Sequence, residues 1–231
     1  MSYVLAASRK GYADMPGRLQ EATGRDFLFI DNPGGLTLDV LRDLDPEMLF
    51  FPHWSHMIPR EIHETWECVV FHMTDLPFGR GGSPLQNLIS RGIRSTQLSA
   101  LRCTAELDAG PIYLKEPLDL SGTAEQIYAR GAGLVEKMIL RIIAERPEPL
   151  PQQGEPVYFK RRTPEQSDLK GLADPRRIFD HIRMLDAEGY PHAFLEVGSL
   201  RLEFTDAQLN DDAVEARVRI VPSTENGEEG S

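Results

Sequence analysis

The first half of the chain alternates short apolar runs with stretches of helical character. The apolar runs occupy positions 3–7, 27–30, 48–51 and 68–71, and the helical stretches between them occupy 16–23, 36–43 and 60–64. Continuous apolar runs separated by helices are typical of parallel strands in a sheet that is covered on both faces. The pattern therefore predicts an α/β domain with a doubly wound, mostly parallel sheet and right-handed crossovers.

A second group of elements completes the large domain. Apolar patterning predicts strands over 95–103 and 112–118, then a long amphipathic helix over 123–145 that ends at Arg146 and Pro147. Four prolines between positions 146 and 156 are typical of a connecting segment. We therefore expect one domain over 1–146, followed by a proline-rich linker over 147–156.

A small α+β unit is expected over 157–222. Asp174 is a suitable N-cap for a helix over 174–185, because Pro175 then occupies the first helical position. The expected strands are 157–160, 194–197, 200–204 and 214–221. The polar residues 223–231 are predicted to form a disordered tail.

The charge balance narrows the range of partners. The 231 residues include 25 Lys and Arg against 36 Asp and Glu, a formal net charge of −11. Nucleic-acid binders normally carry a basic face, because phosphate contacts supply most of their affinity, so we expect no nucleic-acid partner. No apolar run reaches the ~18–20 residues of a membrane helix. Cys68 and Cys103 lie in apolar segments, which predicts reduced, buried thiols in a cytoplasmic protein without membrane association.

Common cofactor motifs are missing from the sequence. It contains neither a Walker loop nor a GxGxxG motif. His53, His56 and His63 do not stand at a metal-ligand spacing with supporting acids, so we interpret them as loop or surface histidines and expect no metal site.

Two stretches carry the strongest chemical signal. The first, over 70–87, directly follows a buried strand and contains His72, a glycine-rich loop, and an expected helix start at Ser83 and Pro84. His72 is thereby placed at the carboxyl edge of a parallel strand, where open α/β sheets bind their ligands. The second, over 106–113, places Asp108 alone on a tight turn between two predicted strands.

Together these stretches resemble the folate-dependent formyltransferase family, whose members formylate glycinamide ribonucleotide, methionyl-tRNA or nucleotide sugars. The family motifs read Asn-x-His-x-Ser-Leu-Leu-Pro followed by Arg-Gly-x-x-Pro, and, further along, Asp-x-Gly-Pro-Ile. The matching positions are His72, Pro77, Arg80, Gly81, Pro84 and residues 108–112. The variant over 75–84 looks most like the nucleotide-sugar N-formyltransferases, which serve surface polysaccharide or flagellin glycan synthesis.

The resemblance implies formyl transfer from N10-formyltetrahydrofolate to the amine of a nucleotide-linked 4-amino-deoxy sugar. Such acyl transfer requires stabilisation of a tetrahedral oxyanion and movement of one proton. By resemblance, His72 takes the oxyanion and proton roles, since the charge of an imidazole changes near neutral pH. Asp108 is expected to orient the imidazole and to accept the proton of the amine.

The resemblance also implies two sets of binding residues. The pterin site would be lined by Phe51, Trp54, Ile58, Leu107 and Asp108, with Trp54 either stacked on the ring or anchoring its loop. The substrate set is Arg80, Gly81 and Asn87. For Arg80 an ion pair that braces the loop is the alternative role.

Two features depart from the family pattern. Val70 stands where the family has a catalytic Asn, and losing one oxyanion donor typically costs about 10²–10³ in rate. Asn87 is the candidate substitute. The N-terminal region also lacks the family's usual Gly-Thr-Pro loop, which speaks against a tRNA substrate. Two alternatives stay open: formylation of another small amine, such as a hydroxyornithine-type precursor, or a folate-binding homologue that has lost catalysis.

The small C-terminal unit is expected to pack against a further surface. Apolar residues alternate along 195–204 and 214–221, while about 65 residues make a marginal core. We therefore expect a two-fold homodimer in which this unit, or the strands just before it, forms part of the contact.

Overall fold

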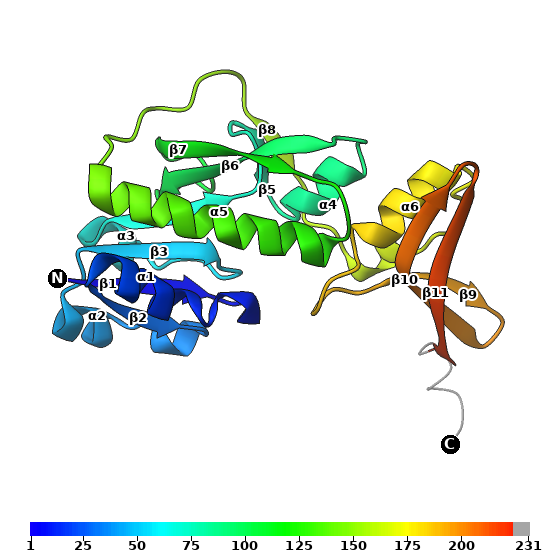
Figure 1. Cartoon of the computed structure of the whole chain (residues 1–231), viewed down its shortest axis with the longest axis horizontal. Helices are drawn as coiled ribbons and strands as arrows, with labels where there is room; N and C mark the ends of the chain where they lie inside the picture. Colours follow the sequence, from blue (N-terminus) through cyan, green and yellow to red (C-terminus); the bar gives the residue numbers. More distant parts are fainter. Residues whose placement is uncertain (224–231) are drawn as a thin grey trace. The chain divides into compact units, whose positions relative to one another are not determined.

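A computed structural model describes residues 1–223 of the chain (Figure 1). The elements of the first half are β1 (Ser2–Ala7), α1 (Met15–Thr23), β2 (Asp26–Ile30), α2 (Leu38–Leu44), β3 (Met48–His53), α3 (Arg60–Thr65), β4 (Cys68–His72), β5 (Phe78–Gly81) and α4 (Pro84–Ile89). Those of the second half are β6 (Ser95–Arg102), β7 (Ile112–Asp119), α5 (Ala124–Glu145), β8 (Val157–Phe159), α6 (Pro175–Arg183), β9 (Ala193–Val197), β10 (Leu200–Asn210) and β11 (Ala213–Pro222). Each predicted helix and strand is present, with boundaries that differ by at most two residues, except that β10 extends six residues beyond the predicted end at 204.

The central sheet has the predicted mostly parallel character. Its six strands follow the order β2-β1-β3-β4-β6-β7. The pairs β1–β2, β1–β3 and β3–β4 are parallel, whereas β6 runs antiparallel to β4, with His72 opposite Ser99. His72 is therefore the last residue of a strand whose parallel neighbour ends at the same edge.

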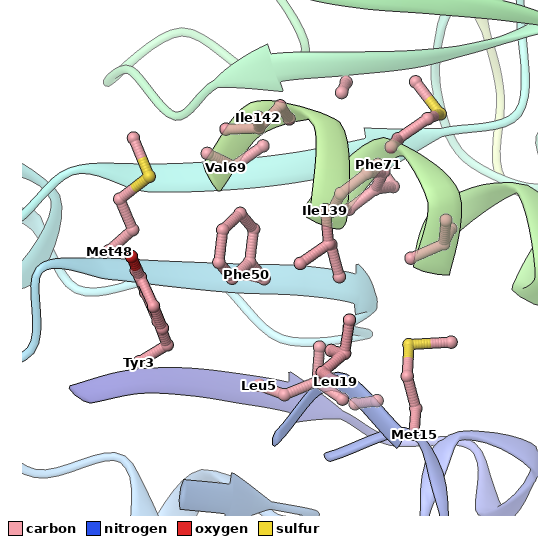
Figure 2. Packing of buried hydrophobic residues seen from close by; sticks show 14 of the residues in the cluster. Tyr3, Leu5, Met15, Leu19, Met48, Phe50, Val69, Phe71, Ile139 and Ile142 are labelled. Atoms are coloured by element: carbon pink, nitrogen blue, oxygen red, sulfur yellow. The ribbon is translucent and has the colours of Figure 1, made fainter. Parts of the chain in front are cut away.

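Apolar side chains cover both faces of this sheet, as the continuous apolar runs predicted. On one face, Leu5, Phe50 and Val69 pack against residues of α1 and α5, including Leu19 and Ile139 (Figure 2). The opposite face is covered by α2 and α3, in a cluster that includes Val4, Leu49, Phe51, Leu41 and Ile62. Since side chains alternate along a strand, β4 presents Val69 and Phe71 to the first face, and Cys68, Val70 and His72 to the second.

The chain forms two compact units, whose limits differ from the expected linear boundaries. The first unit comprises Met1–Pro84, Ser95–Leu118 and Ala129–Phe159, and the second comprises Leu85–Arg94, Asp119–Tyr128 and the chain from Lys160 onward. Long-range contacts explain the difference. Gln86 of α4 donates to Tyr128 Oη and the Met184 carbonyl, and Arg183 donates to the carbonyls of Leu120 and Gly122.

The proline-rich segment is packed against the first unit and is not a free linker. Leu150 pairs with Ile112 through two backbone hydrogen bonds of 2.7 and 2.9 Å. Gln152 donates to the carbonyls of Asp108 and Gly110 at 2.8 and 2.9 Å. These contacts are long-range in sequence, so proline content alone did not reveal them.

The second unit contains α6 and a three-stranded antiparallel sheet in the order β11-β10-β9. Asp174 caps α6 as predicted, because its side chain accepts from the N–H of Arg176 at 2.9 Å. Ser83 is not the extended N-cap expected before Pro84, since its φ is +50°.

Ser223, the first residue of the predicted tail, donates its backbone N–H to the carbonyl of Ser199. The other residues of that tail, 224–231, lie outside the described part of the chain. Within residues 1–223, no helix is both long and apolar enough to cross a bilayer.

Candidate active site

His72 is held at the end of β4 by the glycine-rich loop that follows it. Its Nε2 lies 2.8 Å from the carbonyl oxygen of Gly79. A carbonyl only accepts hydrogen bonds, so Nε2 carries the proton and donates it. In the neutral imidazole the other nitrogen, Nδ1, therefore has the free lone pair. The loop thereby fixes the tautomer as well as the orientation of the ring.

Asp108 faces that lone-pair nitrogen. It lies on the turn between β6 and β7, with φ at +53°, a left-handed conformation that Asp tolerates better than most residues. Its Oδ2 is 3.6 Å from His72 Nδ1, and both side chains are only 9% exposed. The same oxygen accepts the backbone N–H of Gly81 at 2.9 Å. The two predicted catalytic residues are therefore brought together from separate motifs.

Two glycines make this arrangement sterically possible. A Cβ on Gly81 would lie 2.5 Å from the carbonyl oxygen of Phe159, and its φ of +102° also disfavours a side chain. A Cβ on Gly110 would lie 1.8 Å from the carbonyl oxygen of Arg102. The glycines thus permit β8 to approach β5, and the turn carrying Asp108 to approach β6.

Arg80 forms the loop-bracing contacts that were its alternative role. Its buried guanidinium donates to Gln152 Oε1 at 2.9 Å, to Glu106 Oε1 at 3.0 Å and to Tyr158 Oη at 3.3 Å. Glu106 is largely exposed, so the ion pair by itself contributes little to stability. The contacts instead connect the glycine-rich loop, the Asp108 turn and β8.

Gln152 was not predicted as a site residue. Its carboxamide accepts from Arg80 and donates to the carbonyls of Asp108 and Gly110, so it links both motifs. No sequence signal marked it, because it lies between prolines in a segment that was interpreted as a linker. The Gly79 carbonyl was also not predicted as the acceptor for His72, because every residue has a backbone carbonyl and the residue type does not show which one is used.

The residues predicted to line the pterin site differ in exposure. Phe51 is fully buried in the core, and this overturns its expected role as a lining residue. Trp54 is half-buried beside it, with ring centroids 6.0 Å apart, and Ile58 packs on the same cluster. Leu107 is 55% exposed next to Asp108.

Trp54 is also notable for its indole nitrogen. Nε1 is buried and has no hydrogen-bond partner within the described chain. A buried indole N–H without an acceptor is uncommon. Aromatic and apolar side chains with one unmatched donor fit a flat heteroaromatic ring such as a pterin.

The missing oxyanion donor is not replaced by Asn87. Asn87 Nδ2 donates to the carbonyl of Lys160 at 3.0 Å, and its Oδ1 accepts from Arg91 at 2.9 Å. Its amide is therefore engaged within the second unit, which removes the reason for expecting it to act as an oxyanion donor. Val70 packs in the apolar cluster on the α2–α3 side of the sheet, the same side as His72. The position of the family's Asn is thus occupied by an apolar side chain.

Both cysteines are free thiols, and Asp108 contributes to a raised pKa of Cys103. Burial raises the pKa of the Cys103 thiol to about 11, and the negative charge of Asp108 contributes to the increase. Burial also raises the pKa of Cys68. These thiols are therefore neutral at physiological pH.

Comparison with known proteins points to one family. Residues 164–221 match the family model described as methionyl-tRNA formyltransferase, C-terminal domain. A solved methionyl-tRNA formyltransferase from Clostridium thermocellum is 43% identical, with a TM-score of 0.93 over 96% of this chain and 100% of that chain. The methionyl-tRNA formyltransferase of Francisella philomiragia subsp. philomiragia is 25% identical over 82% of this chain and 62% of its own length.

Sugar N-formyltransferases share the fold at a greater distance. The enzyme from Shewanella sp. FDAARGOS_354 is 14% identical, with a TM-score of 0.67 over 94% of this chain. The proposed sugar branch therefore rests on the motif variant alone. The chain spans about three fifths of the Francisella relative. Its similarity to the Clostridium structure over the full length of that chain shows that it belongs to the formyltransferase family.

Proposed function

We propose that this chain transfers a formyl group from N10-formyltetrahydrofolate to a primary amine. The observation that carries the proposal is the approach of His72 Nδ1 to Asp108 Oδ2, 3.6 Å apart at the carboxyl edge of the sheet. A base beside a carboxylate is the pair that proton movement during acyl transfer needs. Membership of the formyltransferase family, whose homologues use this formyl donor, supports the same reaction.

The geometry divides the work between the two residues. Nδ1 of neutral His72, and not Asp108 as the resemblance implied, takes the proton that the amine loses as its nitrogen bonds to the formyl carbon. The Asp108 carboxylate stabilises the imidazolium that results, because opposite charges face each other in a nearly buried setting. Nδ1 then returns the proton to the departing nitrogen as its bond to the formyl carbon breaks. The folate supplies the formyl carbon and leaves as tetrahydrofolate, so one proton is taken up and one released.

For the acceptor we propose the amine of a nucleotide-linked 4-amino sugar. The net charge of −11 and the loop variant over 75–84 support a small acceptor. Methionyl-tRNA is the second candidate, because the more similar relatives carry that name. A hydroxyornithine-type amine is a further candidate acceptor. Because Val70 replaces the family's catalytic Asn, a folate-binding protein without catalysis is the remaining alternative.

The acceptors are distinguished by a parallel turnover assay. The protein is incubated with N10-formyltetrahydrofolate and either a dTDP-linked 4-amino sugar, hydroxyornithine or initiator methionyl-tRNA, and tetrahydrofolate release and the formylated product are both measured. A formylated sugar supports the proposed sugar acceptor. Formylated hydroxyornithine or formylated methionyl-tRNA would identify a different acceptor and would leave the proposed formyl transfer in place. Folate binding without turnover of any acceptor contradicts the catalytic proposal.

A further inference from the structure

The second unit contains a cavity that the formyl-transfer proposal does not use. Its volume is about 260 Å³, and it is lined by the end of α4, the following turn, Leu172 and one face of α6. The lining residues are Ile89, Ser90, Arg91, Gly92, Leu172, Arg177, Asp180, His181 and Met184. All of them belong to the second unit, so the cavity is a feature of that unit alone.

The cavity wall carries an excess of positive charge. Arg91 and Arg177 contribute guanidinium groups, His181 contributes an imidazole, and Asp180 contributes the one carboxylate among the lining residues. That carboxylate is already compensated, because its Oδ1 lies 2.7 Å from Arg183 Nε and 3.9 Å from Arg94 Nη1. The positive groups on the wall are therefore not balanced by Asp180.

Among the basic lining residues, Arg177 is the one that other residues of the described chain do not hold by polar contacts. Its side chain is exposed and forms no hydrogen bond or ion pair with residues 1–223. It lies one helical turn before His181, so both side chains lie on the same face of α6. His181 Nε2 donates to the carbonyl of Gln166 at 2.9 Å, which fixes the imidazole with Nδ1 as its other polar atom. Arg91 is oriented by bonds to the carbonyl and side-chain oxygens of Asn87.

The local electrostatics agree with this geometry. Burial lowers the pKa of His181, and the positive charges of Arg162 and Arg177 lower it further, although the Gln166 carbonyl and Asp168 oppose that change. An anion beside Arg91 and Arg177 would offset their positive charges and would form charge-assisted hydrogen bonds.

The apolar part of the wall indicates what kind of molecule bears the anionic group. Ile89, Leu172 and Met184 provide apolar surface beside the basic groups. A volume of about 260 Å³ is below the roughly 300–1,000 Å³ typical of sites that enclose a whole drug-sized ligand. We propose that this cavity binds the phosphate group of a small phosphorylated organic molecule, with Arg177 as its principal ligand and the apolar wall against the organic part.

Calorimetric titration of the full chain with dUDP and, separately, with inorganic pyrophosphate tests this site. Binding of dUDP is expected to weaken with added salt, and tighter binding of dUDP than of pyrophosphate would assign a role to the apolar wall. Equal affinity would limit the ligand to its phosphate groups and contradict that role.

The matched variants are Arg177→Gln and Arg176→Gln, because the two arginines are adjacent and exposed on α6 but only Arg177 lines the cavity. Loss of one charge-assisted contact is expected to weaken binding about tenfold or more in Arg177→Gln, whereas Arg176→Gln should resemble the wild type. Absence of dUDP binding, or equal weakening in both variants, would overturn the proposal.

A third variant separates this site from the candidate active site. Asp108→Ala should leave dUDP affinity unchanged, because Asp108 belongs to the other unit. If Asp108→Ala abolished binding while Arg177→Gln did not, the nucleotide would bind at the candidate active site and the cavity proposal would be wrong. Failure of formyl transfer would leave the cavity proposal intact.

Discussion

The backbone N–H of Gly81 donates to Oδ2 of Asp108 at 2.9 Å. This bond joins the glycine-rich loop to the turn between β6 and β7, and so connects two motifs that are far apart in sequence. Because the same oxygen faces His72, the loop backbone takes part in orienting the carboxylate. The two motifs therefore form one structural unit.

Gly81→Ala is expected to lower both the melting temperature and formyl transfer. The new Cβ would lie 2.5 Å from the Phe159 carbonyl, so the backbone must shift and its N–H would move from Asp108. Gly154→Ala is the matched control, because Gly154 has a φ of +103° but its nearest atom would be 3.8 Å away. Equal melting temperatures and equal turnover in the two variants would contradict the proposed role of this contact.

Gln152→Ala is expected to reduce turnover about tenfold while the chain stays folded. The substitution removes the carboxamide that supports Arg80 and the carbonyls of Asp108 and Gly110, and misplacement of catalytic groups is costly for rate. Gln153→Ala changes the neighbouring exposed residue and should have no effect. Steady-state kinetics on both variants, with circular dichroism as a folding check, would show whether position 152 has this role.

Cys103 provides a chemical probe of the Asp108 charge. Since its pKa is raised to about 11, the thiol stays neutral at pH 8 and should react slowly with iodoacetamide, with a rate that increases toward pH 11. Asp108→Asn removes a cause of the raised pKa, so the alkylation rate at pH 8 should increase. Mass spectrometry of the modified peptide measures this rate. An unchanged or slower rate would contradict the contribution of Asp108 to the raised pKa of Cys103.

The proposed homodimer places a second copy against the three-stranded sheet. β11 is an edge strand of that sheet, and Val218 and Ile220 on it are exposed. Exposed apolar edge strands favour pairing with another chain. Light scattering should give about 52 kDa, twice the 26.0 kDa chain, and Ile220→Lys should lower that mass. A wild-type mass near 26 kDa at all concentrations would rule out the dimer.

The sequence was sufficient to predict what depends on local pattern. Apolar runs located the strands, and the resemblance of two motifs to the formyltransferase family singled out His72 at a strand end and Asp108 on a turn. Phe51 was misassigned because an apolar run marks a buried strand without showing which side chains remain accessible. Gln152 and the boundaries of the two units depend on contacts between distant segments, such as that between Gln86 and Met184. The hydrophobic periodicity of a local segment does not show which distant residues it contacts.

The central claim is that His72 and Asp108 act as one proton-transferring pair. The most direct test measures formyl transfer by wild type, His72→Ala, Asp108→Ala and the double variant, each checked for an unchanged melting temperature. General acid–base contributions of about 10²–10⁴ predict losses of that order in each single variant. Residues that act as a unit are not additive, so the double variant should be little slower than either single one. Normal turnover in either single variant, or a double loss equal to the product of the single losses, would contradict the account.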